Sequence, residues 1–180
     1  SNSESSANYW ERSINDATNN EFAAQVDYVH PFNNNKQKLE VGAKYVHRDV
    51  RSDYHLETAD NEGQWQQNPN RTNALDYIQQ VAAVYAQFST PVVNKVDAIV
   101  GVRAEYTDID ATQRDFGGAF SDNYFNVLPS AILTYSLSDF NKLKLAYFPR
   151  IGRPSIEYIN PYINYSDAFN LKQGNPELDP

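Results

Sequence analysis

The sequence predicts an all-β fold, an antiparallel meander of about six strands, because polar and apolar residues alternate with a period of two along most of the chain. Two further observations agree with this prediction. The 180 residues are aromatic and polar at once, with 13 Tyr, 9 Phe and 2 Trp but a net charge of −8 and a mean hydropathy of −0.67. Short and long connections also alternate along the chain. Disordered segments are poor in aromatic residues, and the sequence lacks the apolar run of roughly 18 residues that a membrane-spanning helix needs.

Charge and residue usage exclude several classes of function. The net negative charge argues against nucleic-acid binding, which needs clustered Lys and Arg. The chain has no Cys, and this excludes disulfide bonds, thiolate metal sites and a cysteine nucleophile. It has no Met either and opens with Ser1-Asn2, so we interpret it as a piece of a longer protein.

The strands are predicted from where the alternation begins and ends. Residues 1–20 are rich in Ser and Asn without a period, so we expect a loop or tail there and a fragment of a single β-barrel domain over residues 21–180. The expected strands, each with one apolar side, are Phe22–Tyr28, Leu39–Tyr45, Ile78–Phe88, Ala98–Tyr106, Ala131–Leu137 and Leu143–Tyr147. Gln80 breaks the alternation of the third. We still predict a strand there, because β-branched and aromatic residues suit a pleated surface and Pro91 follows soon after.

The connections favour a membrane barrel over a compact domain. Residues 33–37, 89–95 and 138–141 form short connections, whereas residues 48–76, 108–123 and 151–180 are long and polar. Long structureless loops are uncommon in compact soluble domains. Short turns at one end and long loops at the other are typical of outer-membrane barrels. The sequence therefore predicts a partial wall of a transmembrane β-barrel, with apolar residues toward lipid and polar residues toward the lumen.

Aromatic residues fall near both ends of the expected strands, as in the girdles that border the lipid-facing band of such barrels. We expect Tyr28, Phe88, Tyr135 and Phe140 near the short turns. Near the long loops we expect a second group, made of Tyr45, Tyr106, Tyr124, Phe125, Tyr147 and Phe148.

Several ordered motifs resemble those of a known family. They are Val100–Thr107, Asn123–Ser130, Arg150–Ser155, Asn160-Pro161 and Gly174–Pro180. This series resembles the barrel of TonB-dependent outer-membrane receptors, in the outer membrane protein beta-barrel branch common among Bacteroidetes. Phe148-Pro149 departs from the pattern, at a place where polar or basic residues are expected.

The resemblance implies a function that the periodicity alone does not give. It implies part of a receptor in the outer membrane of a Gram-negative cell that imports a nutrient, such as a siderophore, cobalamin, a glycan or a peptide. The implied partners are membrane lipid, a plug domain, TonB and a small nutrient ligand. No plug domain and no TonB-contacting segment is found in the 180 residues, so the fragment is not expected to transport by itself.

The sequence offers no catalytic apparatus, and we expect neither an enzyme nor a cofactor. The glycines never assemble into a phosphate loop, a dinucleotide fingerprint or a nucleophile elbow. Two polar clusters contain metal-ligand residue types but lack a recognised spacing, so we interpret both as solvated surface. They are His47, Asp49, Asp53 and His55, and Asp108, Asp110 and Asp115.

Charged residues on the polar side of the strands are the candidates for a substrate-binding site. Lys44, Arg103 and Glu105 are expected to face the lumen, where they hold a plug, guide a substrate or form ion pairs without a selective role. The alternative fold is a soluble β-sandwich or a small ligand-binding β-barrel, with the apolar residues pointing inward. If the fragment is isolated as a barrel wall, its bare apolar face and open edges predict self-association.

Overall fold

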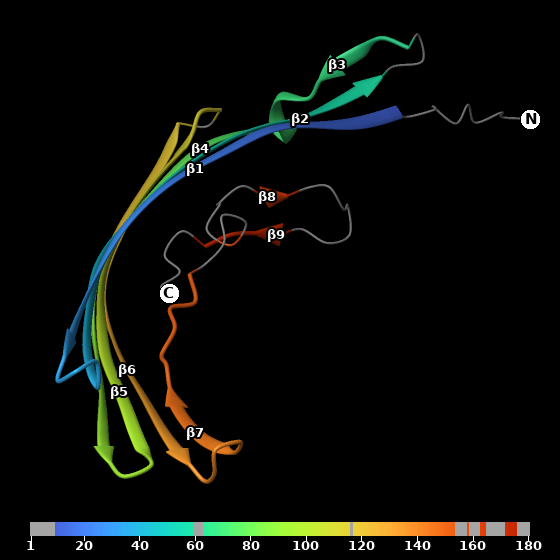
Figure 1. Ribbon diagram of the computed structural model, residues 1–180. Coiled ribbons are helices and arrows are strands. Elements are labelled where there is room, and N and C mark those ends of the chain that lie inside the picture. The colour runs from blue at the N-terminus through green and yellow to red at the C-terminus, as the bar shows by residue number, and fades with distance from the viewer. Residues whose placement is uncertain are drawn as a thin grey trace, which may run out of the picture.

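The computed structural model describes residues 10–59, 63–115, 117–153, 158, 163–164 and 172–175. One curved antiparallel sheet dominates it, formed by β1 (Trp10–Phe32), β2 (Gln37–Ala59), β4 (Asn73–Val93), β5 (Val96–Gln113), β6 (Gly118–Ser136) and β7 (Lys142–Tyr147), which lie side by side in chain order (Figure 1). A short strand, β3 (Trp65–Gln67), pairs with the end of β2, and the 3-10 turn η1 (Pro69–Arg71) leads into β4. A separate pair, β8 (Ile163–Asn164) and β9 (Lys172–Gln173), completes the described elements. The predicted meander of six strands is confirmed.

Every pairing in the main sheet is antiparallel between neighbours, as the short turns require. The first turn places Asn33, Asn34 and Asn35 at positive φ angles of 48°, 54° and 67°. Asn tolerates this left-handed region better than most residues, so three consecutive Asn residues suit the bend. The second turn reverses the chain between Val93 and Val96, with Lys95 at a φ of 70°.

Three connections predicted as long loops, or as a tail, are largely strand. β1 begins at Trp10, so residues 10–20 are not the predicted loop, while residues 1–9 lie outside the described part. β2 continues to Ala59, within the predicted loop over residues 48–76. β5 ends only at Gln113 and β6 already begins at Gly118, so the predicted loop over residues 108–123 is reduced to a short turn. Backbone hydrogen bonds to a neighbouring strand hold these extensions without any need for one apolar face. Side-chain alternation does not reveal such strands.

The last strand of the main sheet is short for a reason visible in the sequence. β7 ends at Tyr147, which pairs with Ala131 of β6. Continuing this register by two residues would place Pro149 opposite Pro129, and neither proline has an N–H to donate. The chain therefore leaves the sheet, and the segment after β7 turns into the concave side (Figure 1). Residues 154–155 of the motif Arg150–Ser155, the motif Asn160-Pro161 and residues 176–180 of the motif Gly174–Pro180 lie outside the described residues.

The two faces of the sheet are distinguished by the segment that follows β7. Arg153 of that segment contacts Glu105, so the odd-numbered residues of β5 lie on the concave side, here called the inner face. The register then places Lys44, Arg103 and Glu105 on the inner face and Tyr45, Val102 and Tyr106 on the opposite, outer face.

The outer face carries an apolar band about as tall as a bilayer core. Its upper row is Ala24, Tyr45, Ala82, Tyr106 and Phe125, and its lowest row is Val96, Tyr135 and Leu143. Tyr106 and Val96 are ten positions apart along β5. At about 3.3 Å per residue and a strand tilt of about 40°, this spacing gives a height near 25 Å, the usual height of the lipid-facing band.

The side chains in this band are exposed, as lipid contact requires. Val26, Val84, Val102 and Leu145 are 71%, 59%, 45% and 72% exposed. The main sheet is a single layer in which this apolar face stays uncovered, so the structure does not have the soluble sandwich considered as the alternative. Within the described residues no helix is long and apolar enough to cross a membrane.

The aromatic residues agree with the girdle prediction in part. Tyr45, Tyr106 and Phe125 form the upper border of the band on the outer face. Tyr124 instead lies on the inner face, opposite Thr107, and Tyr147 pairs with Ala131 inside the band, because β7 is too short to reach the upper border. Tyr124 therefore lies at the expected end of its strand but not on the lipid side, and the placement of Tyr147 was wrong. Phe148 lies just beyond the end of β7.

Above the band, the strands continue as an upper sheet, made of residues 10–22, 47–59, 73–80, 108–113 and 118–123. Its small core lies on the inner face, where Tyr77 and Ile109 are 2% and 6% exposed and pack with Val50, Phe120 and Tyr124. Burial is the main cause that raises the pKa of Tyr77 to about 12, and Tyr124 beside it adds to the shift. The outer face here carries ion pairs, beside the exposed side chains of Phe22 and Ile78.

Candidate functional site

The inner face of the band brings the three predicted lumen residues into one region. Lys44 of β2 lies opposite Ala83 of β4, and Ala83 lies opposite Glu105 of β5, so these three share one row across the sheet. Asn126 of β6 continues this row on the other side of Glu105. Arg103 is two residues from Glu105 on the same strand and the same face.

Glu105 is the centre of the cluster and is only 4% exposed. Its Oε2 accepts hydrogen bonds from Arg103 Nε at 2.9 Å and Arg103 Nη2 at 2.7 Å. Its Oε1 contacts Arg153 Nη2 of the segment after β7. A buried carboxylate needs such partners, since an unpaired buried charge is strongly destabilising. One carboxylate therefore holds two guanidinium groups, which leaves this cluster with a net positive charge.

Arg153 is the functional candidate that the sequence did not single out. It lies in the motif Arg150–Ser155, which contributed to the family resemblance, but the connection was expected only to be long and polar, and no strand pattern marks Arg153. Its pKa is below the ordinary value for arginine, because burial and the neighbouring Arg103 both disfavour the charged guanidinium. The group still remains charged at neutral pH. Its role depends on a contact across the fold, which local spacing does not reveal.

Asn126 and Lys44 have unused polar groups near this cluster. The Asn126 Nδ2 atom is buried and has no hydrogen-bond partner in the part of the chain that the structure describes. No ion pair between described residues involves Lys44. An amide donor and an ammonium group therefore flank the two guanidinium groups on the inner face.

A second polar contact on the inner face spans three strands. Tyr85 of β4 donates a hydrogen bond from its hydroxyl to Asp27 of β1, across Gly42 of the intervening strand β2. A Cβ atom at position 42 would lie 2.5 Å from Tyr85 Cε1 and would also overlap Asp27. The glycine is therefore needed for the tyrosine ring to cross β2.

The two polar clusters interpreted as solvated surface lie on the outer face above the band or in a turn. His47, Asp49, Asp53 and His55 follow one another along β2, opposite β1 residues Phe22, Asn20, Asp16 and Ile14. Asp53 forms an ion pair with Arg114. Asp108 and Asp110 lie on β5, whereas Asp115 lies in the turn that follows it. In the described ranges no three His, Cys, Asp or Glu side chains gather in a way that would hold a metal ion.

The geometry defines the class of protein: an apolar outer band of bilayer height, a polar inner face and strands joined in chain order form the wall of an outer-membrane β-barrel. The family model of the outer membrane protein beta-barrel family matches residues 1–180, and the chain belongs to that family. Its location is the outer membrane.

Among solved structures, the chain is similar to the ferric citrate transporter FecA in its unliganded form. The two share 17% sequence identity with a TM-score of 0.54, and the match covers 77% of this chain and 22% of FecA. This similarity shows the fold, a barrel wall. No match was found among curated proteins.

Proposed function

We propose that the chain is part of the barrel of a TonB-dependent outer-membrane receptor that imports a nutrient. In this proposal the barrel is completed by further strands and closed by a plug domain, and TonB supplies the coupling to the inner membrane. The substrate is a siderophore, cobalamin, a glycan or a peptide. The barrel family and the similarity to a transporter wall support this proposal, and they offer no reason to assign an enzymatic reaction.

The inner-face cluster is the single observation that carries the proposal. Barrel interiors are polar, and in an importer that polar wall lines the path of the substrate or contacts the plug. Here Lys44 lies in the same row as Glu105, and Arg103 and Arg153 bind the two carboxylate oxygens of Glu105. We propose that Lys44, Arg103 and Glu105 contact the substrate or the plug domain along the import path.

Uptake by cells that depend on the whole barrel protein tests the import function. The panel is a ferric siderophore, cobalamin, an oligosaccharide and a peptide, each labelled and supplied at limiting concentration. Uptake of one of them should disappear when the inner-membrane energy coupling is abolished. Uptake of none, or uptake that persists without the coupling, would contradict the proposal.

The role of the inner face is tested separately. Lys44→Ala and Arg103→Ala should lower uptake relative to the amount of folded protein in the membrane, because both remove inner-face charges. Val100→Leu is the matched control, since Val100 is 52% exposed on the outer face of the same β5 strand as Arg103. If all three variants transport equally, the inner-face residues have no role in import.

A further inference from the structure

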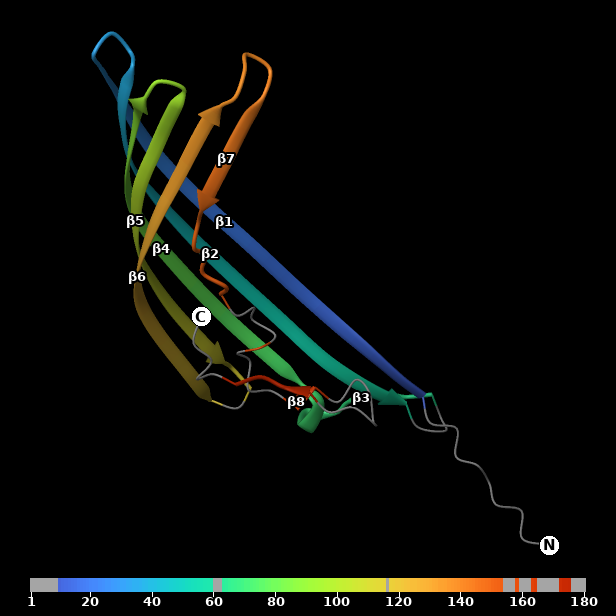
Figure 2. The same cartoon turned by 90° about the horizontal axis from the view of Figure 1, so that it is seen from below.

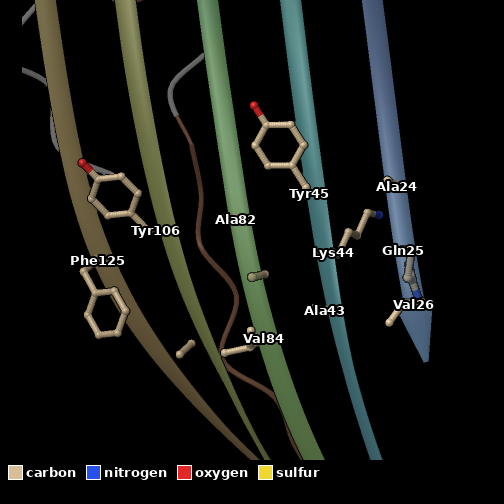
Figure 3. A pocket seen from close by; sticks show the side chains of 12 residues that line it. Ala24, Gln25, Val26, Ala43, Lys44, Tyr45, Ala82, Val84, Tyr106 and Phe125 are labelled. Carbon is tan, nitrogen blue, oxygen red and sulfur yellow. The ribbon is translucent and has the colours of Figure 1, made fainter. Parts of the chain in front are cut away.

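A largely apolar hollow lies on the outer face at the top of the band. Gln25 and Lys44, which the register places on the inner face, also contribute to its lining. Its volume is about 540 Å³, within the range of small-molecule pockets. Four alanines, Ala24, Ala43, Ala82 and Ala104, contribute to its lining from four neighbouring strands. The rings of Tyr45, Tyr106 and Phe125 stand on the same side of the sheet (Figure 3).

The register explains why the sheet is hollowed here. Along the upper row of the band, Ala24 lies opposite Tyr45, Tyr45 opposite Ala82, and Ala82 opposite Tyr106. In the next row, valine and alanine alternate in the same way. Directly opposed residues are only about 5 Å apart, so a methyl group between two large side chains leaves space that the sheet does not fill.

The rim of the hollow marks the boundary between apolar and polar surroundings. The Tyr45 hydroxyl donates a hydrogen bond of 2.9 Å to Gln80 Oε1, in the polar row immediately above the band. This contact holds the ring at the border, with its polar end toward the water side. Below the rim the outer face is apolar down to the short turns. A ligand that fits both parts is long and apolar, with a polar end at the rim.

We propose that this hollow binds one acyl chain of an outer-membrane lipid more tightly than the rest of the band does. The hollow is continuous with the apolar band, and in the outer membrane that band contacts lipid. All of its lining residues except Gln25 and Lys44 are aliphatic or aromatic, and its rim coincides with the aromatic border at which a lipid headgroup would lie. The proposal depends on the membrane location and not on the imported substrate.

Photo-crosslinking of the whole barrel protein in lipid nanodiscs tests the proposal. The probe is phosphatidylethanolamine with a photoactivatable diazirine on one acyl chain, diluted into unlabelled lipid. Cross-linked peptides should concentrate on residues 82–84 and 104–106, with fewer at the outer-face positions of residues 96–102. Cross-links spread evenly over the band would overturn the proposal.

A filled hollow provides the matched comparison. Ala82→Phe places a ring in the hollow, whereas Ala131→Phe adds the same ring to the same face outside it. In Ala82→Phe the lipid acyl chain should lose the contacts of about two methylene groups with the hollow, so cross-linking there should fall about tenfold. In Ala131→Phe cross-linking at the hollow should be unchanged. An equal fall in both variants would overturn the acyl-chain site. Cross-links that join two copies of the protein in place of lipid would assign the hollow to a dimer contact and would also overturn it.

Discussion

The band and the upper sheet are parts of the same strands, yet their apolar side chains gather on opposite faces. In the band, valines, leucines and aromatic rings point outward and charged residues such as Arg103 and Glu105 point inward. In the upper sheet, Tyr77 and Ile109 are buried on the inner face. The outer face there carries Arg51, Asp76 and Arg114.

The change in which face is apolar indicates the surroundings of each region, lipid around the band and water around the upper sheet. It occurs over one row, because Tyr45, Ala82 and Tyr106 are followed on the outer face by His47, Gln80 and Asp108. An outward apolar side chain is stable against lipid, whereas above the rim the outer face meets water and the apolar core lies on the inner face. The long diagonal course of the strands carries both regions in one continuous sheet (Figure 2).

The largest effect we expect concerns the isolated 180-residue chain in water. Its band exposes an apolar outer face that only lipid would cover, and its edge strands have free backbone groups. We predict that the chain self-associates, through paired outer faces or paired edges. Light scattering without detergent measures this. A stable monomer that binds no apolar dye would show that the band is already covered, and the assignment of the outer face would fail.

A charge in the band should damage the whole barrel protein. Val102→Arg places a cation on the lipid side near mid-band, at a cost of about 2 to 4 kcal/mol. Thr112→Arg on the same face of the same strand lies in the upper sheet and should cost little. Arg103→Ala on the inner face should lower the yield less than Val102→Arg does, because Glu105 keeps its contact with Arg153. Heat-modifiable gel mobility of membrane fractions compares the three, and equal yields would contradict the two-region description.

High pH should destabilise the upper sheet through Tyr77. Its folded pKa is about 12 against an ordinary value of 10.0, so the neutral form is favoured in the fold. The stability from this shift is fully present below pH 10 and is lost as the pH rises from 10 toward 12. The loss is at most about 2 to 3 kcal/mol.

Denaturation midpoints at pH 9 and pH 11.5 measure the effect of Tyr77. The change between the two pH values should be smaller in Tyr77→Phe than in the unmodified protein. Tyr106→Phe, at an exposed tyrosine on the outer face, is the control and should leave the change as it was. Identical behaviour of all three proteins would mean that Tyr77 is not buried.

The contact across β2 predicts an intermediate effect in the band. Gly42→Ala would push the new methyl group against Tyr85 and Asp27 and break their hydrogen bond. We expect a loss of about 1 to 3 kcal/mol, typical of overpacking. Gly152→Ala is the control, because a Cβ there meets nothing within 4 Å. Denaturation of the whole barrel protein measures both, and an unchanged Gly42→Ala variant would show that Tyr85 does not cross β2.

The same contrast explains what the sequence could predict. In the band one face is apolar, so the period of two gave Leu39–Tyr45 and Ala98–Tyr106 correctly, and it placed Lys44, Arg103 and Glu105 on one face. In the upper sheet polar residues such as Asn19 and Asp53 occupy strand positions, and backbone pairing holds them there. Side-chain pattern carries no signal for such strands. Gln80, the exception in the predicted pattern, is explained by its place in the first polar row, where it accepts the hydrogen bond from Tyr45.

The smallest effect we expect separates exposed from buried ion pairs. Arg114 bonds Asp53 at 2.6 Å and Asp76 at 3.0 Å on the outer side of the upper sheet, where all three side chains are about a third or more exposed. Arg114→Ala should therefore cost only about 0.2 to 1 kcal/mol at low salt. At 1 M salt the Debye length is about 3 Å, so the cost should become too small to measure.

Glu105→Ala is the contrasting variant, because it leaves Arg103 and Arg153 without their shared buried carboxylate. Its cost should be larger and should change little with salt, since buried charges are screened much less than exposed ones. Unfolding midpoints of both variants at low and high salt decide this, and an Arg114→Ala cost that persists at 1 M salt would place Arg114 in a dry environment and remove the difference between the two regions.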